Sequence, residues 1–257
     1  YATLVTDSSY LAGAIVLAWS LQTCGSTLPL IVLYTPSVEE DAVRCLELES
    51  KQANIILRKV YTVLPPLDDP TKEESLDERF GDTWTKLRVF ELVEYDKVCY
   101  LDADMLVLKN MDTVFSYAYA LTSSVSLVAT QLCCCNLDPN EREPENCPYT
   151  KEQDQPALAG SNPTAADPRT HHLINSGLFV FNPSRELRDS IHSRLRNLTP
   201  SGKVAEVPDH AFFQDFLTNF FKDGFVPLRW YYNASKTLRD SHPNVWKDDL
   251  VVGFHYL

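Results

Sequence analysis

Residues 98–104 read Val-Cys-Tyr-Leu-Asp-Ala-Asp, a short apolar run that leads directly into two carboxylates separated by one residue. The apolar run predicts a buried β-strand. In an extended chain, residues i and i+2 point to the same side, so Asp102 and Asp104 can converge on one point. Two like charges at such a distance repel each other, and a divalent cation relieves the repulsion. The local pattern is equally typical of two aspartates that cap a turn or a helix.

Short apolar segments alternate with helical patterns on the N-terminal side of this strand. Strands are expected over 2–6, 30–34 and 54–60, with helices over 8–22 and 38–51 between them. Such alternation predicts an α/β fold, in which a mostly parallel sheet is flanked by helices. Ligands of these sheets collect at the carboxyl ends of the strands, which is where the two aspartates lie.

The rest of the chain contains two polar segments and several further elements. Residues 68–82 are charged and predict a surface loop, and residues 136–172 hold six prolines and predict a long loop. A helical period returns over 83–94. Further expected elements are a strand over 177–181, helices over 184–197 and 209–221, and a last strand over 250–254.

The composition excludes several classes of protein. The 257 residues carry 23 basic and 35 acidic side chains, a formal net charge of −12, which disfavours binding of nucleic acid through its phosphates. A 44 % hydrophobic content fills the core of one large domain. The eight glycines are too far apart for G-x-G-x-x-G or a P-loop. Any bound phosphate therefore needs another partner, such as a cation held by carboxylates.

The cysteines and the hydropathy pattern bear on the compartment. Seven cysteines are an odd number in a chain of this length, which favours free thiols and a cytoplasmic location over a disulfide framework. Zinc binding by Cys133, Cys135 and Cys147 is conceivable, but no C-x-x-C pair occurs and we expect free thiols. The longest apolar stretch, 11–21, is too short for a membrane span, although an upstream targeting segment remains open.

Six motifs follow one another along the chain. They are Thr3-Leu4-Val5-Thr6-Asp7-Ser8-Ser9-Tyr10, Thr85-Lys86-Leu87-Arg88, Tyr100-Leu101-Asp102-Ala103-Asp104, Asn175-Ser176-Gly177-Leu178-Phe179, Pro208-Asp209-His210 and Tyr231-Tyr232-Asn233. In this order they resemble the retaining glycosyltransferases of the glycogenin and galactinol synthase group, glycosyltransferase family 8. The resemblance implies a GT-A (Rossmann-like) fold, a UDP-sugar donor and Mn²⁺.

The resemblance also implies roles for individual residues. Leu4, Thr6, Asp7 and Tyr10 match positions that hold the uridine, and the backbone of Ala103 matches one near the ribose. The catalytic set would be Lys86 near the donor, Asn175 against the donor sugar and Asp209 beneath that sugar. Asp102, Asp104 and His255 match the metal ligands, and this donor set suits Mn²⁺. Each of these residues also has a purely structural explanation. Tyr10 could be a packed aromatic, Lys86 a solvated lysine, Asn175 part of a turn, Asp209 a helix N-cap and His255 a structural histidine.

The sequence departs from the family pattern at several positions. His210 stands where the family usually has glutamine, and Asp7 where it often has asparagine. The basic segment that follows the histidine in the family is missing, because the chain stops at Leu257. We therefore expect one domain over 1–257, truncated at its C-terminus, with a nucleotide-binding half over 1–110 and an acceptor and sugar half over 173–257.

The resemblance leaves the acceptor open. No tyrosine lies between Asn233 and Val252, where glycogenin glucosylates itself, so self-glucosylation is not expected. Residues 64–66, 133–135 and 240–245 look more like galactinol synthase, which transfers galactose from UDP-galactose to myo-inositol. We expect transfer from UDP-glucose or UDP-galactose to a small polyol or saccharide, with specificity set by the loop 136–172. The sequence does not fix the oligomeric state.

Two other interpretations remain at this point. A nucleotide-sugar-binding protein without turnover would keep the same motifs. A phosphatase of the haloacid dehalogenase type also has D-x-D at a strand end, with the first aspartate as nucleophile. That class places the motif on its first strand, whereas about a hundred residues precede Asp102 here.

Overall fold

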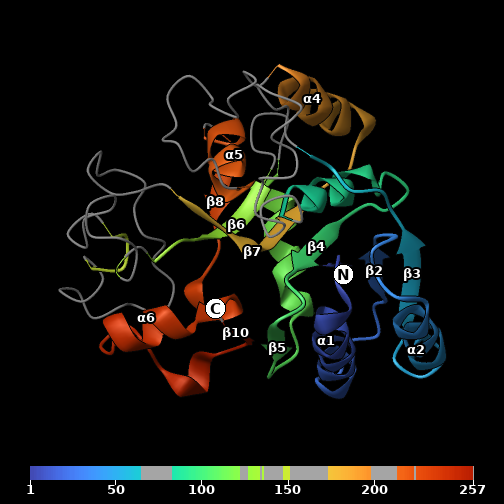
Figure 1. Cartoon of the computed structure of the whole chain (residues 1–257). Helices are drawn as coiled ribbons and strands as arrows, with labels where there is room; N and C mark the ends of the chain where they lie inside the picture. The colour runs from blue at the N-terminus through green and yellow to red at the C-terminus, as the bar shows by residue number, and fades with distance from the viewer. Residues whose placement is uncertain are drawn as a thin grey trace.

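A seven-stranded sheet runs through the middle of the protein, in the order β3-β2-β1-β4-β7-β6-β8 (Figure 1). The computed structural model describes residues 1–64, 83–121, 127–133, 135, 147–150, 173–197, 213–222 and 224–256. The strands are β1 (Ala2–Val5), β2 (Leu30–Tyr34), β3 (Ile55–Lys59), β4 (Val98–Leu101), β6 (Leu127–Gln131), β7 (Ile174–Phe181) and β8 (Phe225–Pro227). Strand β7 runs antiparallel to both of its neighbours, β4 and β6, while the other pairs are parallel.

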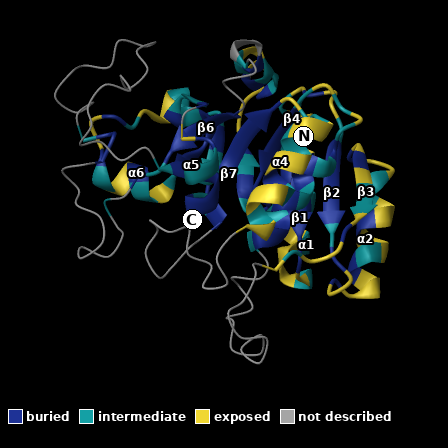
Figure 2. Cartoon of the chain, turned by 90° about the horizontal axis from the view of Figure 1, so that it is seen from above, coloured by how far each residue is buried: buried dark blue, intermediate teal, exposed yellow. Residues whose placement is uncertain are grey.

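Both faces of the sheet are covered, which explains the continuous apolar runs of its strands. In β4, Cys99 and Leu101 point into one hydrophobic cluster, and Val98 and Tyr100 point into the other. Two separate cores therefore form, one on each face of the sheet. In Figure 2 the buried strands lie between helices whose outer surfaces are exposed.

Different helices cover the two faces (Figure 1). Helices α1 (Leu11–Thr23) and α2 (Glu40–Ser50) pack on one cluster. The 3₁₀ helix Thr85–Glu91 and helices α4 (Arg185–Arg196) and α5 (Phe213–Phe220) pack on the other. The 3₁₀ helices Ser8–Tyr10 and Asp112–Ala120 join neighbouring elements.

A small second sheet lies beside the carboxyl end of β4. It has the order β5-β10-β9, with β5 (Met105–Val107), β10 (Gly253–His255) and β9 (Ala234–Ser235). The 3₁₀ helix Trp230–Tyr232 precedes β9, helix α6 (Lys236–Ser241) follows it, and a 3₁₀ turn, Asp248–Leu250, leads towards β10. A third, smaller hydrophobic cluster packs these segments against Cys133, Cys147 and Tyr149.

The structure confirms the predicted α/β class and the mostly parallel sheet. The strands expected over 2–6, 30–34, 54–60 and 98–101 are present within a residue at each end. Strand β7 begins at Ile174, three residues earlier than expected. Short strands and turns that lack a clear period, such as β5, β8 and β9, are absent from the sequence prediction.

Two predicted elements differ in kind or position. The helical period over 83–94 is a 3₁₀ helix, in which Leu87 and Phe90, three residues apart, both point into the core. The strand expected over 250–254 lies instead over Gly253–His255, because pairing with β5 and β9 begins only there. Most of the segments 68–82 and 136–172, as well as 209–212, lies outside the described residues.

Among the described residues, no helix combines the length and the apolar character that crossing a bilayer requires.

The aromatic cluster beside β4 gives a test of the core. Phe179 is fully buried and stacks on Phe90 and Tyr100, with ring centroids 5.6 Å and 4.9 Å away. Phe179→Ala should lower the free energy of unfolding by about 3–5 kcal/mol, because it removes these contacts and leaves a cavity. Urea denaturation measures the change. The exposed Leu48→Ala is the control, with a change expected within about 0.5 kcal/mol; equal effects of the two would contradict this packing.

Candidate active site

The Asp-Ala-Asp turn at the end of β4 is held from two sides. The backbone N–H of Asp102 donates to the carbonyl of Gly177 in β7 at 2.9 Å, and Met105 N–H donates to the carbonyl of Asp102 at 3.1 Å. On the other side, a Cβ at Gly13 of α1 would overlap the carbonyl oxygen of Ala103. Only a glycine lets the first turn of α1 approach this closely. The turn is therefore fixed by the main sheet and by α1 together.

Lys86 forms an ion pair with Asp102. Its Nζ lies 2.7 Å from one carboxylate oxygen and 2.9 Å from the other, and both side chains are largely buried. The ammonium also lies 5.7 Å from the centroid of Tyr100 and 5.8 Å from that of Phe213. Tyr100 OH donates to Asp102 Oδ1 at 2.9 Å. Burial, and then the charge of Asp102, keep the pKa of Tyr100 well above its usual value, so this hydroxyl remains a donor.

His255 reaches the same carboxylates from β10 of the small sheet. Its Nε2 lies 3.3 Å from Asp104 Oδ1 and 3.9 Å from Asp102 Oδ2. Its Nδ1 lies 2.9 Å from Asn233 Oδ1, and Asn233 Nδ2 donates to Thr130 Oγ1 at 2.8 Å. Because the amide NH₂ faces Thr130, Asn233 presents its oxygen to His255 and accepts the Nδ1 proton.

This hydrogen bond leaves a lone pair on His255 Nε2. The atom is buried and has no hydrogen-bond partner among the described residues. A lone pair that faces two carboxylates is unfavourable in a low-dielectric setting, and a cation between them removes the conflict. The second bond, from the ring Nδ1–H to an acceptor, is the usual support of a metal-binding histidine.

The donor set therefore fits a divalent cation. One ligand atom from each of Asp102, Asp104 and His255 can be chosen so that all lie within 4.8 Å of one another. Oxygen and imidazole ligands together suit Mn²⁺.

Gly177 makes room for the histidine. A Cβ at this position would come within 2.8 Å of His255 Nδ1 and closer still to Cε1. The same glycine donates its N–H to Asn175 Oδ1 at 2.9 Å. The motif Asn175-Ser176-Gly177 is thus more than a turn before a strand, because its glycine lies against the imidazole and its asparagine faces the cavity.

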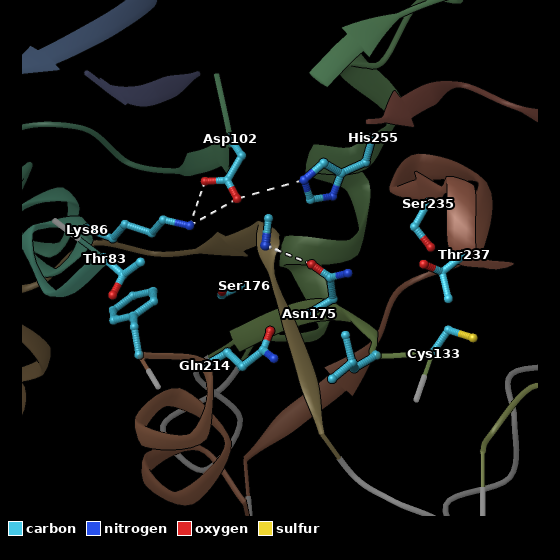
Figure 3. Close-up of a pocket in the computed structure, with 13 residues that line it drawn as sticks. Thr83, Lys86, Asp102, Cys133, Asn175, Ser176, Gln214, Ser235, Thr237 and His255 are labelled. Carbon is cyan, nitrogen blue, oxygen red and sulfur yellow. Dashed lines mark hydrogen bonds and ion pairs between the residues drawn. The ribbon is translucent and has the colours of Figure 1, made fainter. Parts of the chain in front are cut away.

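A cavity of about 360 Å³ opens in front of these residues (Figure 3). In the close-up, Lys86 and His255 approach Asp102 from opposite sides, and Asn175 lies between His255 and Gln214. The lining residues are Thr83, Lys86, Asp102, Leu132, Cys133, Asn175, Ser176, Gly177, Phe213, Gln214, Ser235, Thr237 and His255. Four of the residues predicted from the sequence, Lys86, Asp102, Asn175 and His255, are thereby brought together.

The predicted uridine-binding residues lie at the carboxyl end of β1, the strand beside β4. Leu4 and Thr6 are buried, whereas Tyr10 is 51 % exposed. Asp7 is exposed, and its carboxylate accepts the N–H of Ser9 at 2.8 Å, so it caps the turn Ser8–Tyr10. These four residues and Ala103 do not line the cavity. Their place next to the Asp-Ala-Asp turn suits a ligand that extends from the cavity towards α1.

Two predicted residues, Asp209 and His210, lie outside the described part of the chain. Their roles stay predictions.

The sequence did not predict three features of the site: the hydrogen bond between Asn233 and His255, the hydrogen bond from Tyr100 to Asp102, and the place of Gln214 in the cavity wall. The motif Tyr231-Tyr232-Asn233 was a signal for the first of these. A tyrosine two residues before Asp102, on the same side of a strand, was a signal for the second.

Solved glycosyltransferases of the GT-A fold share the fold of this chain. The galactosyltransferase LgtC, solved with donor and acceptor sugar analogues, superposes with a TM-score of 0.63 at 17 % identity, over 99 % of this chain and 86 % of LgtC. The glycosyltransferase GlyE of Streptococcus pneumoniae TIGR4 gives a TM-score of 0.61 at 16 % identity, over 100 % of this chain and 54 % of GlyE. At these identities the likeness establishes the GT-A fold.

The sequence identifies the family. Residues 2–256 match the model of glycosyl transferase family 8, and the chain belongs to this family. Galactinol synthase 1 of Solanum lycopersicum is 29 % identical over 264 residues, which cover 98 % of this chain and 69 % of that protein. The predicted family is confirmed, and the phosphatase interpretation is wrong.

Asn233 provides a test of the cation site. Asn233→Ala removes the acceptor of His255 Nδ1–H, so the imidazole loses its fixed tautomer and orientation. The affinity for Mn²⁺ should fall about 10- to 100-fold, as measured by titration with paramagnetic resonance detection of free Mn²⁺. Asn110→Ala, which removes only the cap of the Asp112 N–H, should leave the affinity unchanged. Unchanged affinity in Asn233→Ala would contradict the assigned role of His255.

Proposed function

We propose that the protein is a retaining hexosyltransferase that moves glucose or galactose from a UDP-sugar to a small polyol or saccharide, with Mn²⁺ as cofactor. The observation that carries the proposal is the buried Nε2 of His255, which faces Asp102 and Asp104 without a hydrogen bond. Family membership supports sugar transfer, and the carboxylate cluster at the strand ends supports a donor that carries a diphosphate.

Asp102, Asp104 and His255 are the proposed ligands of Mn²⁺. When bound, the cation supplies Lewis-acid stabilisation of the charge that develops on the departing UDP. Two carboxylates against the single ammonium of Lys86 leave the cluster negatively charged, so it favours a cation over a bare anion. Lys86 holds Asp102 in place and adds a positive charge at the edge of the cavity. The sequence contains no glycine-rich phosphate-binding loop. The bound cation and the ammonium of Lys86 are proposed to balance the charge of the diphosphate in its place.

The donor is proposed to extend from the cavity along the first turn of α1. Tyr10 is half exposed and would stack on the uracil, while Leu4, Thr6 and Asp7 would border the nucleoside and Ala103 the ribose. Such a path continues the nucleotide-binding half over 1–110 into the sugar half over 173–257. Asn175 faces the cavity, where it would contact the donor sugar. Asp209 is proposed to lie beneath that sugar, as the family resemblance implies, and His210, which replaces the family's usual glutamine, is proposed to contact the nucleotide-sugar.

The cavity walls suit a small hydroxylated acceptor. Thr83, Ser176, Ser235 and Thr237 supply hydroxyls and Gln214 an amide, all of which match alcohol groups. Similarity to proteins named galactinol synthases supports a polyol such as myo-inositol as the first acceptor to test. The described cysteines form no disulfide, which favours a reducing compartment, and we propose the cytoplasm.

A coupled assay of UDP release tests the proposal. The protein is incubated with UDP-galactose or UDP-glucose, myo-inositol and Mn²⁺, and the product is analysed by NMR. We expect UDP release that requires Mn²⁺ and an α-configured product. Asp104→Asn should lower kcat/KM at least about 100-fold, because a ligand and a charge are lost near the leaving group.

Asp41→Asn is the matched control, since Asp41 is exposed on α2 and lies outside the site. It should leave kcat/KM unchanged. An inverted anomer, or full activity without a divalent cation, would contradict the proposal. Tight binding of UDP-sugar without release of UDP, across donors and acceptors, would favour a binding protein without turnover.

A further inference from the structure

A second cluster of metal-ligating side chains adjoins the cavity, and its member Cys133 forms part of the cavity wall. Cys133, Cys135, Cys147 and His242 each present one ligand atom, and these atoms lie within 4.8 Å of one another. The cluster shares no residue with Asp102, Asp104 and His255. The role proposed above for those three residues does not involve it.

The distances within this cluster match a tetrahedral site. His242 Nε2 lies 3.1 Å from Cys135 Sγ and 3.5 Å from Cys147 Sγ, and Cys147 Sγ lies 4.0 Å from Cys133 Sγ. Zinc bonds of about 2.3 Å to sulfur and about 2.0 Å to nitrogen place ligand atoms about 3.8 Å (S to S) and about 3.5 Å (S to N) apart in a tetrahedron. The side chains are thus already arranged around a volume of the right size.

The ligands come from three segments that are distant in the sequence. Cys133 and Cys135 follow strand β6, Cys147 begins a turn that ends at Thr150, and His242 directly follows helix α6 as its C-cap. Cys147 and His242 are 95 residues apart. Cys133, Cys147 and His242 are all buried, and Cys135 is half-buried. Surface thiols that approach one another by chance would be exposed, whereas these ligand atoms are mostly buried and lie at distances that suit one metal ion.

Three cysteine thiols and one imidazole crowd together here, and three of these four side chains are buried. A divalent cation binds such cysteines as thiolates and displaces their protons to the solvent.

We propose that Cys133, Cys135, Cys147 and His242 form a structural zinc site. Zinc takes Cys₃His sets, and four protein ligands leave no open position for substrate, which is the pattern of a structural rather than a catalytic site. Softer thiolate ligands also select against Mn²⁺ and Mg²⁺, so this site and the carboxylate site would hold different ions.

The position of the zinc site next to α6 and β9 indicates which part of the structure it stabilises. The third hydrophobic cluster is small, and its elements are short: α6 has six residues and β9 two. Ser235 and Thr237 at the start of α6 line the cavity, as does Cys133. Strand β9 also pairs with β10, which carries His255. Zinc beside the end of α6 would therefore fix the part of the cavity wall that Cys133, Ser235 and Thr237 form. This consequence for substrate binding rests on the proposed function, whereas the zinc site itself does not.

The metal content of the purified protein tests the proposal. We expect one zinc per chain by inductively coupled plasma mass spectrometry, after purification without chelators or added zinc. Cys147→Ser should lose this zinc. Cys45→Ser, which removes an exposed thiol of α2, and Asp104→Asn, which alters the carboxylate site, should both retain it.

Two further measurements test the zinc site even if the Cys147→Ser variant does not fold. His242→Cys creates a Cys₄ set and should still bind one zinc. Replacement of zinc by Co²⁺ in the unmodified protein should give the strong visible bands of a tetrahedral site and a thiolate-to-cobalt charge-transfer band. Absence of both zinc and the cobalt spectrum would overturn the proposal. So would a Cys133–Cys147 disulfide in protein kept under reductant, or zinc that Cys147→Ser retains in full. Loss of sugar-transfer activity alone would not affect it, because each readout is metal binding.

Discussion

The central constraint on the candidate site is that the carboxylates of Asp102 and Asp104 lie close together. Asp102 and Asp104 leave the same strand two residues apart, and His255 adds a lone pair from a different sheet. Such a cluster is unfavourable in a buried setting unless positive charge balances it. Lys86 supplies part of this charge, and the remainder fits a divalent cation. Gly13, Gly177 and Asn233 matter because they let the surrounding elements hold this arrangement at close range.

The first half of the fold could be predicted from the sequence, because β1, β2 and β4 are buried on both faces and therefore read as short apolar runs. Residues 30–34 and 98–101 are examples, where continuous apolar runs end at polar residues. Strands β5 and β9 could not be predicted, since they have three and two residues and pair with segments far away in the chain, whereas the strand expected over 250–254 is present with shifted bounds as β10. Their stability comes from tertiary contacts rather than from local preference.

The sequence predicted those residues of the candidate site that lie within continuous motifs. It did not predict contacts between residues that only folding brings together. Asp102 and Asp104 follow from one short stretch, and Lys86, Asn175 and His255 from the family resemblance. The bond between Asn233 and His255 spans 22 residues and joins the residue before β9 to β10, two short strands whose pairing the sequence does not indicate. The cysteines show the same limit: no C-x-x-C pair is present, and the fourth ligand, His242, comes from a helix end about a hundred residues further on. Free thiols were the simpler expectation.

The central claim is that a divalent cation joins the carboxylate cluster to the diphosphate of the donor. A thermal-shift measurement in buffer stripped of divalent cations tests it most directly, with UDP alone, Mn²⁺ alone and the two together. The account predicts a large shift only with both ligands, worth about 2.7 kcal/mol when the UDP concentration is about 100 times its Kd. An equal shift from UDP without Mn²⁺ would contradict the account.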